Sequence, residues 1–354
     1  MQLQNRNKMK NLKIVEKKLG KGLIPDTKDE RDLKYSDVLG AGPVMTEEEW
    51  RQGFDIEKEL NIKIPFKNQC SSLSCVGQGF SYQTAVINAK EVGRYDEASA
   101  KAIYSQIFLP GGGAHLRDAA KLLVNWGALL ETQLKSYKSD GTTDEKFITD
   151  LSWLNPELSQ LAKVLQAKEY RTMSGLGIDY FARAIKDNLG CVGGVAGANN
   201  GTWSSNEPKP PINIKAISWY HCLYFGKFGI DEKGKYIATP NSWGTRNSAD
   251  ALHPDDWQKI REDYFKDNNY FIINPWTLID KPNEPNKPIN KITMVMIKKV
   301  GAAAVYAQVG DTLIPFATTW DEYLAEYPTA KIIELSAAEF SKYRIAATLG
   351  IKKK

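Results

Sequence analysis

Four residues in the sequence have the types and the order that cysteine-based catalysis requires. Gln69 and Cys75 stand six residues apart early in the chain, and His221 and Asn241 follow much later. A cysteine becomes a nucleophile when an imidazole ionises its thiol and a third polar group orients the imidazole. The pattern therefore predicts that Cys75 attacks a carbonyl carbon, with His221 as its base and Asn241 as the orienting group. Gln69 would donate a hydrogen bond to the developing oxyanion.

Each of these residues also has an ordinary structural explanation. A cysteine in an apolar stretch is more often a small core residue than a nucleophile. A single histidine is more often a core or surface group with its hydrogen bonds satisfied. The run Asn241-Ser242-Trp243-Gly244 could be a turn with a packed aromatic ring, because Asn and Gly favour turns. The order of all four residues, in a chain with only three histidines, nevertheless favours the catalytic interpretation.

The segments that carry these residues resemble the papain-like cysteine peptidases. In that family a Gln stands six residues before the nucleophile, as Gln69 does before Cys75. A helix of small and apolar residues follows the nucleophile, as residues 76–89 predict here. His221 lies 146 residues after Cys75 (221 minus 75), within the range of about 130–150 expected for such chains. The resemblance extends over residues 22–250.

Two features resemble bacterial members of the family more than the plant enzymes. Val76 follows the nucleophile, where the plant enzymes have Trp. Upstream, Ile24-Pro25-Asp26 and residues 29–32 resemble the entry segment that bacterial members place before the catalytic domain. We therefore expect the chain to fall in the bacterial-type branch.

The resemblance implies an α+β fold with a helical lobe, a β-rich lobe and a site in the cleft between them. The helix that starts at Cys75 and residues 98–109 and 114–126 would form the helical lobe. Alternating or continuous apolar runs would supply strands to the other lobe, at residues 191–198, 215–228 and 234–239.

The resemblance also implies substrate-binding roles for four residues. Gly112 and Gly113 match the family's Gly-Gly turn, and Trp243 would cover the catalytic imidazole. Trp219 stands two residues before the histidine and would line the pocket for the substrate's second residue from the cut, with Val195 a possible neighbour. An ordinary core position for Trp219 is an equally open alternative. The implied reaction needs no cofactor and no metal.

The position of Cys75 favours a reactive thiolate. A free thiol has a pKa of about 8.5, and a helix N-terminus or a neighbouring imidazolium lowers it. Because Cys75 stands where a helix is predicted to begin, we expect its pKa to be lowered.

The other cysteines depart from the family pattern. Ser72 occupies the position of a cysteine that usually forms a disulfide. Cys70 and Cys191 remain as a spare pair, but we expect the chain to be reduced. Cys222 is either a second thiol near the site or a residue that points away from it. The second interpretation is favoured, because neighbouring residues of a strand point to opposite faces.

Composition limits the alternatives to a peptidase. The chain has 354 residues, of which 42% are hydrophobic and 25% charged, which suits one medium domain and a smaller one. The net charge of +5 (47 minus 42) lies partly in the two ends, which we expect to be solvated tails and not a nucleic-acid surface. No stretch approaches the ~20 apolar residues of a membrane span, and the first residues lack the apolar segment of a signal peptide. We expect a cytoplasmic protein, or one that is particle-associated or released without a standard signal peptide.

The sequence predicts four successive regions. They are a mobile basic segment at residues 1–21, the peptidase domain at 22–280, a Pro-rich linker at 281–291 and a small α+β docking module at 292–354. In the module, strands are expected at residues 292–297, 303–309, 312–314 and 331–335, and helices at 320–327 and 337–343. In the peptidase domain, the polar segments 132–180 and 199–211 could border the cleft.

Three functions remain open from the sequence. An endopeptidase or related amide hydrolase, which cuts a peptide or protein substrate through an acyl-enzyme, is favoured by the complete set of Gln, Cys, His and Asn. The missing family disulfide and the added module allow a catalytically idle structural or binding protein of a particle or surface assembly. A cysteine amidase or transferase, for example one that acts on cell-wall peptide, is the third.

Overall fold

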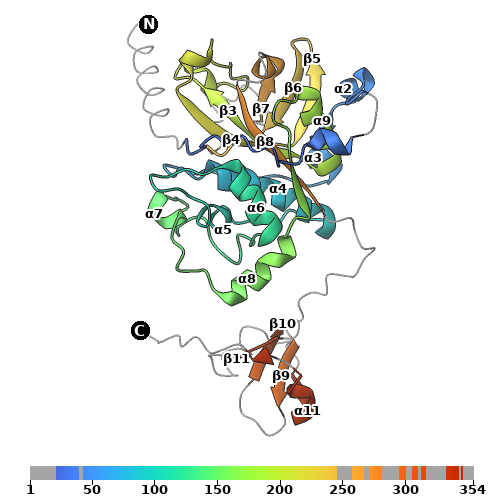
Figure 1. The fold of residues 1–354 in the computed structure, drawn as a ribbon, viewed down its shortest axis with the longest axis vertical. Helices are drawn as coiled ribbons and strands as arrows, with labels where there is room; N and C mark the ends of the chain where they lie inside the picture. The colour runs from blue at the N-terminus through green and yellow to red at the C-terminus, as the bar shows by residue number, and fades with distance from the viewer. Residues whose placement is uncertain are drawn as a thin grey trace. The chain divides into compact units, whose positions relative to one another are not determined.

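The computed structural model describes residues 21–39, 43–244, 257–266, 271–280, 295–299, 305–309, 312–315, 332–342 and 344–345. The chain divides into two compact units, Met1–Lys281 and Pro282–Lys354. In the first unit, most helices gather in one lobe and the sheets gather in the other (Figure 1). Among the described helices, none is long and apolar enough to cross a membrane.

Helix α4 (Cys75–Val92) lies on the side of the helical lobe that faces the sheets (Figure 1), and buried residues occur on all its sides. Fourteen of its 18 residues are buried, as expected for a helix inside a core. A Cβ at Gly77 would lie 2.8 Å from the Ala100 carbonyl oxygen, and a Cβ at Gly79 would lie 2.8 Å from the Cys222 sulfur. The two glycines therefore allow other parts of the chain to approach this helix closely.

Shorter helices pack around α4 in the helical lobe. They are α5 (Ala100–Tyr104), α6 (Leu116–Asn125), α7 (Glu145–Ile148), α8 (Pro156–Ala162) and η2 (Lys163–Leu165). Helix α6 is amphipathic and buries Leu116, Ala119, Ala120 and Leu123. Helices α5 and α6 lie within the segments that the sequence predicted for this lobe.

The β-rich lobe contains two four-stranded sheets, and every strand pair in them is antiparallel. One sheet has the order β1 (Phe54–Asp55), β5 (Lys227–Asp231), β6 (Gly234–Thr239), β7 (Gln258–Arg261). The other has the order β2 (Glu169–Thr172), β8 (Ile272–Ile279), β3 (Cys191–Gly197), β4 (Trp219–Phe225). Helical segments complete this unit: η1 (Tyr35–Val38), α2 (Glu47–Gln52), α3 (Ile56–Glu59), α9 (Ile178–Asn188), η3 (Thr202–Ser204), η4 (Ile214–Ala216) and η6 (Glu262–Phe265).

Strand β4 contributes to two hydrophobic cores because its side chains alternate between the faces of the sheet. Cys222 and Tyr224 belong to the core that contains α4, whereas Leu223 and Phe225 belong to the core that contains α9. In the β3–β4 pair, Val195 lies opposite His221. The strands predicted at residues 191–198, 215–228 and 234–239 are found as β3, β4 with β5, and β6.

The segment 132–180, expected only as polar loops beside the cleft, contains helices and a strand. Asp144 and Asn155 begin α7 and α8, since each side chain accepts a hydrogen bond from the backbone N–H three residues later. Strand β2 then pairs with β8 at the edge of its sheet. The polar residues that suggested loops are therefore partly helix caps.

The unit Pro282–Lys354 contains a five-stranded sheet in the order β12, β9, β10, β11, β13. Its elements are β9 (Val295–Lys299), β10 (Val305–Val309), β11 (Thr312–Pro315), β12 (Ile332–Leu335), α11 (Ala337–Phe340) and β13 (Arg344–Ile345). Helix α11 begins with a capping box between Ser336 and Glu339. The predicted helix at 320–327, the linker at 281–291 and residues 1–20 of the basic segment lie outside the described residues.

Candidate active site

Gln69 and Cys75 lie in the segment that leads into α4, and this segment is bonded to the residues that follow β6. The Gln69 backbone N–H donates to the Ser242 carbonyl at 2.8 Å, and the Ser242 hydroxyl donates to Gln69 Oε1 at 2.6 Å. Gln69 Nε2 donates to the Ser72 carbonyl at 2.9 Å. Because Gln69 is fully buried, these bonds hold its Nε2 in the loop that precedes Cys75.

His221 and Asn241 come together on the β-rich side. His221 lies in β4 and Asn241 follows β6, and His221 Nε2 lies 2.8 Å from Asn241 Oδ1. The Ser242 backbone N–H donates to the same oxygen at 2.6 Å. Asn241 has a φ of 60°, a left-handed conformation that Asn tolerates better than most residues. His221 Nδ1 is buried and has no hydrogen-bond partner among the described residues.

One tryptophan stacks on the imidazole, and two more pack against that tryptophan. The Trp243 ring stacks on His221, with ring centroids 4.2 Å apart and an angle of 21° between the planes. Trp219 and Trp203 meet the edge or face of Trp243 with centroid distances of 5.9 Å and 5.8 Å. Trp219 is 9% exposed and its Nε1 donates to Asn199 Oδ1 at 3.0 Å. The stacking of Trp243 has the geometry expected of a cover over the ring, while the pocket role of Trp219 stays a prediction.

Residues Lys21–Ile24, which we term the cover strand, run along the residues that precede α6. Leu23 and Ala114 form a parallel β-bridge. The Ala114 N–H donates to the Gly22 carbonyl at 2.9 Å, and the Ile24 N–H donates to the Ala114 carbonyl at 3.0 Å. The cover strand therefore binds through its backbone, in the way that an added β-strand binds to an edge.

Gly22 brings the cover strand onto the candidate nucleophile. Its backbone lies close enough to the Cys75 thiol to oppose the rise in the pKa of that group, and Cys75 is 0% exposed. A Cβ at Gly22 would lie only 1.7 Å from the Leu73 carbonyl oxygen, so no other residue fits here without displacement. At the start of the strand, the Lys21 ammonium lies 4.5 Å from the centre of a Trp219 ring. Lys21, which the sequence placed at the end of a mobile segment, thus contacts the aromatic cluster.

Burial shifts the pKa of the Cys75 thiol in the direction opposite to the one that the sequence predicted. It raises the pKa of Cys75 to about 11, against the smaller opposing effect of nearby backbone groups. Burial also lowers the pKa of His221 to about 3, although the hydrogen bond to Asn241 acts in the opposite direction. The prediction of a lowered thiol pKa is therefore wrong for the covered site. At neutral pH the thiol and the imidazole are both uncharged.

Gly112 and Gly113, predicted to lie beside a substrate backbone, form the turn before Ala114. Both have positive φ, 91° and 83°. A Cβ at Gly113 would lie 2.5 Å from the Gly22 carbonyl oxygen, and a Cβ at Gly112 would lie 2.4 Å from Leu73 Cδ1. Gly113 therefore makes room for the cover strand and Gly112 for Leu73, while the hydrogen bonds to the cover strand come from Ala114, one residue later than the predicted pair.

The described cysteines are all free. Cys70 is partly exposed, and Cys75, Cys191 and Cys222 are buried. The Cys222 sulfur packs toward Gly79 in α4, which agrees with the prediction that its side chain and that of His221 point in different directions. In the described part of the chain, no group of three or more His, Cys, Asp or Glu residues could hold a metal ion.

Several residues that complete the site were not predicted from the sequence. Gln258 in β7 accepts a hydrogen bond from Asn241 Nδ2 at 2.6 Å, and the Tyr82 hydroxyl donates to the Asn241 carbonyl at 3.0 Å. No sequence motif surrounds Gln258 in its strand, and Tyr82 fits the pattern of small and apolar residues in the predicted helix. Neither residue therefore has a sequence signal that links it to the site. Ile24 was assigned to the entry segment before the catalytic domain, but the sequence did not predict that residues 21–24 cover Cys75.

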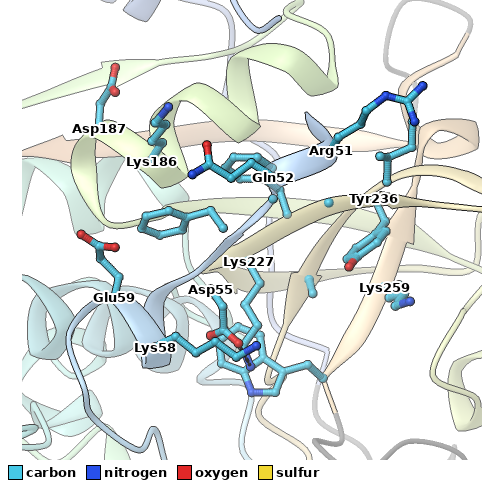
Figure 2. Close-up of a pocket in the computed structure, with 17 residues that line it drawn as sticks. Arg51, Gln52, Asp55, Lys58, Glu59, Lys186, Asp187, Lys227, Tyr236 and Lys259 are labelled. Carbon is cyan, nitrogen blue, oxygen red and sulfur yellow. Dashed lines mark ion pairs between the residues drawn. The ribbon is translucent and has the colours of Figure 1, made fainter. Parts of the chain in front are cut away.

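An open pocket of about 910 Å³ lies elsewhere, between α2, α3, the end of α9 and the sheet that contains β5 (Figure 2). Its charged side chains are largely paired: Lys227 with Asp55 at 3.3 Å, and Lys259 with Asp231 at 2.9 Å. None of the four candidate catalytic residues lines this pocket. Cavity size therefore does not locate the candidate active site in this chain.

Solved structures with a similar fold are cysteine proteases. Xylellain, a cysteine protease from Xylella fastidiosa, matches with a TM-score of 0.58 at 17% identity, over 75% of this chain and 97% of that chain. Procathepsin L 3 of the Tenebrio molitor larval midgut matches with a TM-score of 0.52 at 16% identity, over 77% and 79% of the two chains. ProCathepsin B S9 from Trypanosoma congolense matches with a TM-score of 0.52 at 12% identity, over 75% and 87%.

No protein-family model matches the sequence, and no curated protein matches it either. The structural likeness, at identities of 12–17%, establishes the fold. The first unit of the chain therefore has the two-lobed α+β fold of the papain-like cysteine proteases.

Proposed function

We propose that the chain is a papain-like cysteine peptidase of the bacterial type, which hydrolyses peptide bonds through a thioester on Cys75. The observation that carries the proposal is the arrangement around His221. Its Nε2 is held by Asn241 at 2.8 Å, and its buried Nδ1 has no partner among the described residues. The Cys75 thiol lies against the backbone of Cys222, the residue after His221 in β4.

In the proposed reaction, His221 Nδ1 accepts the thiol proton, and the resulting Cys75 thiolate bonds to the substrate carbonyl carbon. Gln69 Nε2 and the Cys75 backbone N–H donate to the oxyanion that forms on the carbonyl oxygen. The imidazolium then gives its proton to the leaving amine as the C–N bond breaks, which leaves a thioester. A water molecule, deprotonated by His221, attacks the thioester and releases a carboxylic acid and the free thiol.

Displacement of the cover strand precedes substrate binding in this proposal. The strand bonds to the backbone of Ala114 and covers Cys75, where an extended peptide would otherwise lie. When the strand leaves, water and substrate reach the thiol and the imidazole, and the desolvation that keeps both groups neutral is relieved. The thiolate–imidazolium pair that the reaction needs then becomes accessible.

A catalytically idle binding protein is the competing function, and one observation favours it. Cys75 is 0% exposed and its pKa is raised to about 11, as for a structural cysteine. An idle protein has no need of a histidine with a buried nitrogen that lacks a partner among the described residues, in the strand whose next residue, Cys222, lies against the Cys75 thiol. The peptidase therefore remains the better account. A cysteine amidase or transferase would use the same residues and differs only in its substrate.

Two assays test the proposal together. The purified chain is incubated with a peptide library and with cell-wall peptide fragments, and is separately treated with an epoxysuccinyl thiol inhibitor followed by mass mapping. We expect cleavage of peptides and modification of Cys75. Cleavage of cell-wall fragments alone would indicate the amidase, and absence of both cleavage and Cys75 modification after displacement of the cover strand would indicate the idle protein.

We also propose that the unit Pro282–Lys354 serves for docking to a larger partner and takes no part in the chemistry. The support is that this unit has its own five-stranded sheet and that all four proposed catalytic residues lie in the first unit. A chain ending at Asp280 should cleave small peptides at close to the full-length rate. A large loss of cleavage by the shortened chain would instead assign the unit a role in the site.

A further inference from the structure

Gln258 is a buried polar residue that contacts the group proposed to orient His221. Its side chain is 0% exposed. Its Oε1 accepts from Asn241 Nδ2 at 2.6 Å, and its Nε2 donates to the carbonyl oxygens of Trp203 at 3.1 Å and Ser205 at 2.9 Å. The bonds to Asn241 and Trp203 are buried and the bond to Ser205 is partly buried, so the loss of this set of hydrogen bonds is costly.

Only one orientation of the Gln258 side-chain amide satisfies all of these hydrogen bonds. A carbonyl oxygen accepts and never donates, so both amide hydrogens of Gln258 face Trp203 and Ser205. Its oxygen must then face Asn241. If the Gln258 amide were turned over, its oxygen would lie against two other acceptors and its NH₂ group would meet the NH₂ group of Asn241.

The same reasoning determines which ring nitrogen of His221 carries the hydrogen. Asn241 presents its NH₂ group to Gln258 and therefore its oxygen to His221, where the Ser242 backbone N–H also requires an acceptor at 2.6 Å. His221 Nε2, at 2.8 Å from that oxygen, must carry a hydrogen. In the neutral ring Nδ1 is then unprotonated, which is the form that can accept a proton from the Cys75 thiol.

We propose that Gln258 is a positioning residue that fixes the side-chain amide of Asn241 and thereby holds His221 in the tautomer with hydrogen on Nε2. The inference rests on the proposed roles of Cys75 and His221 in catalysis. Gln258 acts through Asn241 and does not touch the substrate. It also bonds the loop that contains Trp203 to the site, and the Trp203 ring contacts Trp243, which stacks on the imidazole.

Nitrogen NMR of the full chain labelled with ¹⁵N-histidine tests the tautomer directly. The chain has three histidines, so the His221 signals can be assigned by substitution. In the unmodified chain we expect Nε2 protonated and Nδ1 unprotonated. In Gln258→Met, which is similar in size but cannot donate or accept strongly, we expect a mixture of tautomers, because Asn241 is no longer held in one orientation.

Kinetics give a second readout. The Asn241 hydrogen bond raises the pKa of His221, so its loss in Gln258→Met should move the alkaline limb of the kcat/KM profile to lower pH. We expect kcat/KM to fall by about 10- to 100-fold, mostly in kcat, because the imidazole is misaligned with the thiol. Gln258→Glu is isosteric, and in its protonated form it keeps an acceptor toward Asn241. It should therefore retain more activity than Gln258→Met.

Gln83→Met is the matched control. Gln83 is a buried glutamine in α4 whose Nε2 donates to the Gly190 carbonyl at 2.8 Å, away from the imidazole. We expect this variant to keep the His221 tautomer and the position of the alkaline limb. If both Gln258 variants behave like the unmodified chain, or if Gln83→Met produces the same changes, the inference is overturned. Failure of the proposed peptidase activity would appear separately, as an unmodified chain with no cleavage and no Cys75 labelling, while the NMR readout would still report on Gln258.

Discussion

The candidate active site and the open pocket differ in how their polar groups are satisfied. In the site, Cys75 and His221 are fully buried, and His221 Nδ1 has no hydrogen-bond partner among the described residues. In the pocket of about 910 Å³, Lys227 pairs with Asp55, while Lys186 and Lys259 pair with the carboxylates of Glu49 and Asp231, which lie outside its lining. These charges of the open pocket therefore have partners. In the candidate active site, His221 Nδ1 is buried and has none among the described residues.

This difference shows that a site filled by part of its own chain is not marked by a cavity. The types and contacts of its residues can still identify it. The cover strand fills the space beside Cys75 with backbone, and its Gly22 allows the close approach. A buried polar nitrogen without a partner calls for an explanation, although other buried side-chain atoms of the described residues, among them Gln78 Oε1 and Thr84 Oγ1, also have none. A proton acceptor for a catalytic thiol supplies that explanation, and no comparable group needs one among the paired charges of the pocket.

The largest expected effect is the loss of peptide cleavage when Cys75 is substituted, compared with a substitution at the open pocket. Cys75→Ala should reduce peptide cleavage by about 10⁴-fold or more, since loss of a nucleophile leaves only binding and oxyanion stabilisation. Cys191→Ala removes another buried sulfur, in β3, and should leave the rate unchanged. Lys58→Ala, at the pocket, should also leave the rate within twofold. Steady-state cleavage of a small peptide checks all three, and a large loss in Lys58→Ala would move the chemistry toward the pocket.

A smaller effect is expected for the oxyanion donor. Gln69→Ala should lower kcat by about 10²- to 10³-fold with a modest change in KM, because the oxyanion exists only near the transition state. The separation of kcat from KM is the measurement that decides. A rise in KM at unchanged kcat would show that Gln69 binds the substrate in its ground state.

The smallest effect concerns Glu49, which pairs with Lys186, a residue that lines the pocket. Lys186, followed by the Thr46 backbone N–H, lowers the pKa of Glu49 to about 2. A carboxyl whose folded-state pKa is depressed stabilises the fold above its ordinary pKa, and this contribution disappears as the pH falls toward 2. Because the group is close to the surface, Glu49→Gln should lower Tm at pH 7 by no more than about 3 °C.

The pH dependence provides the control for that prediction. The Tm difference between Glu49→Gln and the unmodified chain should shrink between pH 5 and pH 2, as the carboxyl of the unmodified chain is protonated. Glu59→Gln, exposed at the same pocket, should show no such trend. A difference that stays constant with pH would mean that the ion pair is not its source.

Much of the fold was predictable because its signals are local. The small and apolar residues after Cys75 predicted α4, and the alternating runs around His221 predicted β3, β4 and β6. The strands of the second unit also follow the predicted apolar runs. Helices α7 and α8 were missed because the segment 132–180 was interpreted only as polar, although Asp144 and Asn155 within it cap the two helices.

The sequence predicted which residues form the candidate site, but not their burial or their protonation states. Gln69, Cys75, His221 and Asn241 were found from order and spacing, but the sign of the thiol pKa shift was wrong. That sign depends on burial beneath the cover strand, a contact between residues far apart in the chain. Gln258 was missed for the same reason, since only the folded chain shows that its amide faces Asn241.

The most direct test of the account measures how fast Cys75 reacts when the cover strand is displaced. Gly22→Ala should displace it, because a Cβ there would overlap the Leu73 carbonyl at 1.7 Å. Gly177→Ala is the matched control, since a Cβ at Gly177 meets nothing within 4 Å. Labelling with an epoxysuccinyl inhibitor is followed by mass mapping across a pH series.

The unmodified chain and Gly177→Ala should label Cys75 slowly at pH 7, because burial raises its pKa to about 11 and lowers that of His221 to about 3. In Gly22→Ala, labelling of Cys75 at pH 7 should be at least about tenfold faster, with the pH profile moved to lower pH as the thiolate becomes accessible. Equal, slow labelling of Cys75 in all three chains would contradict the account.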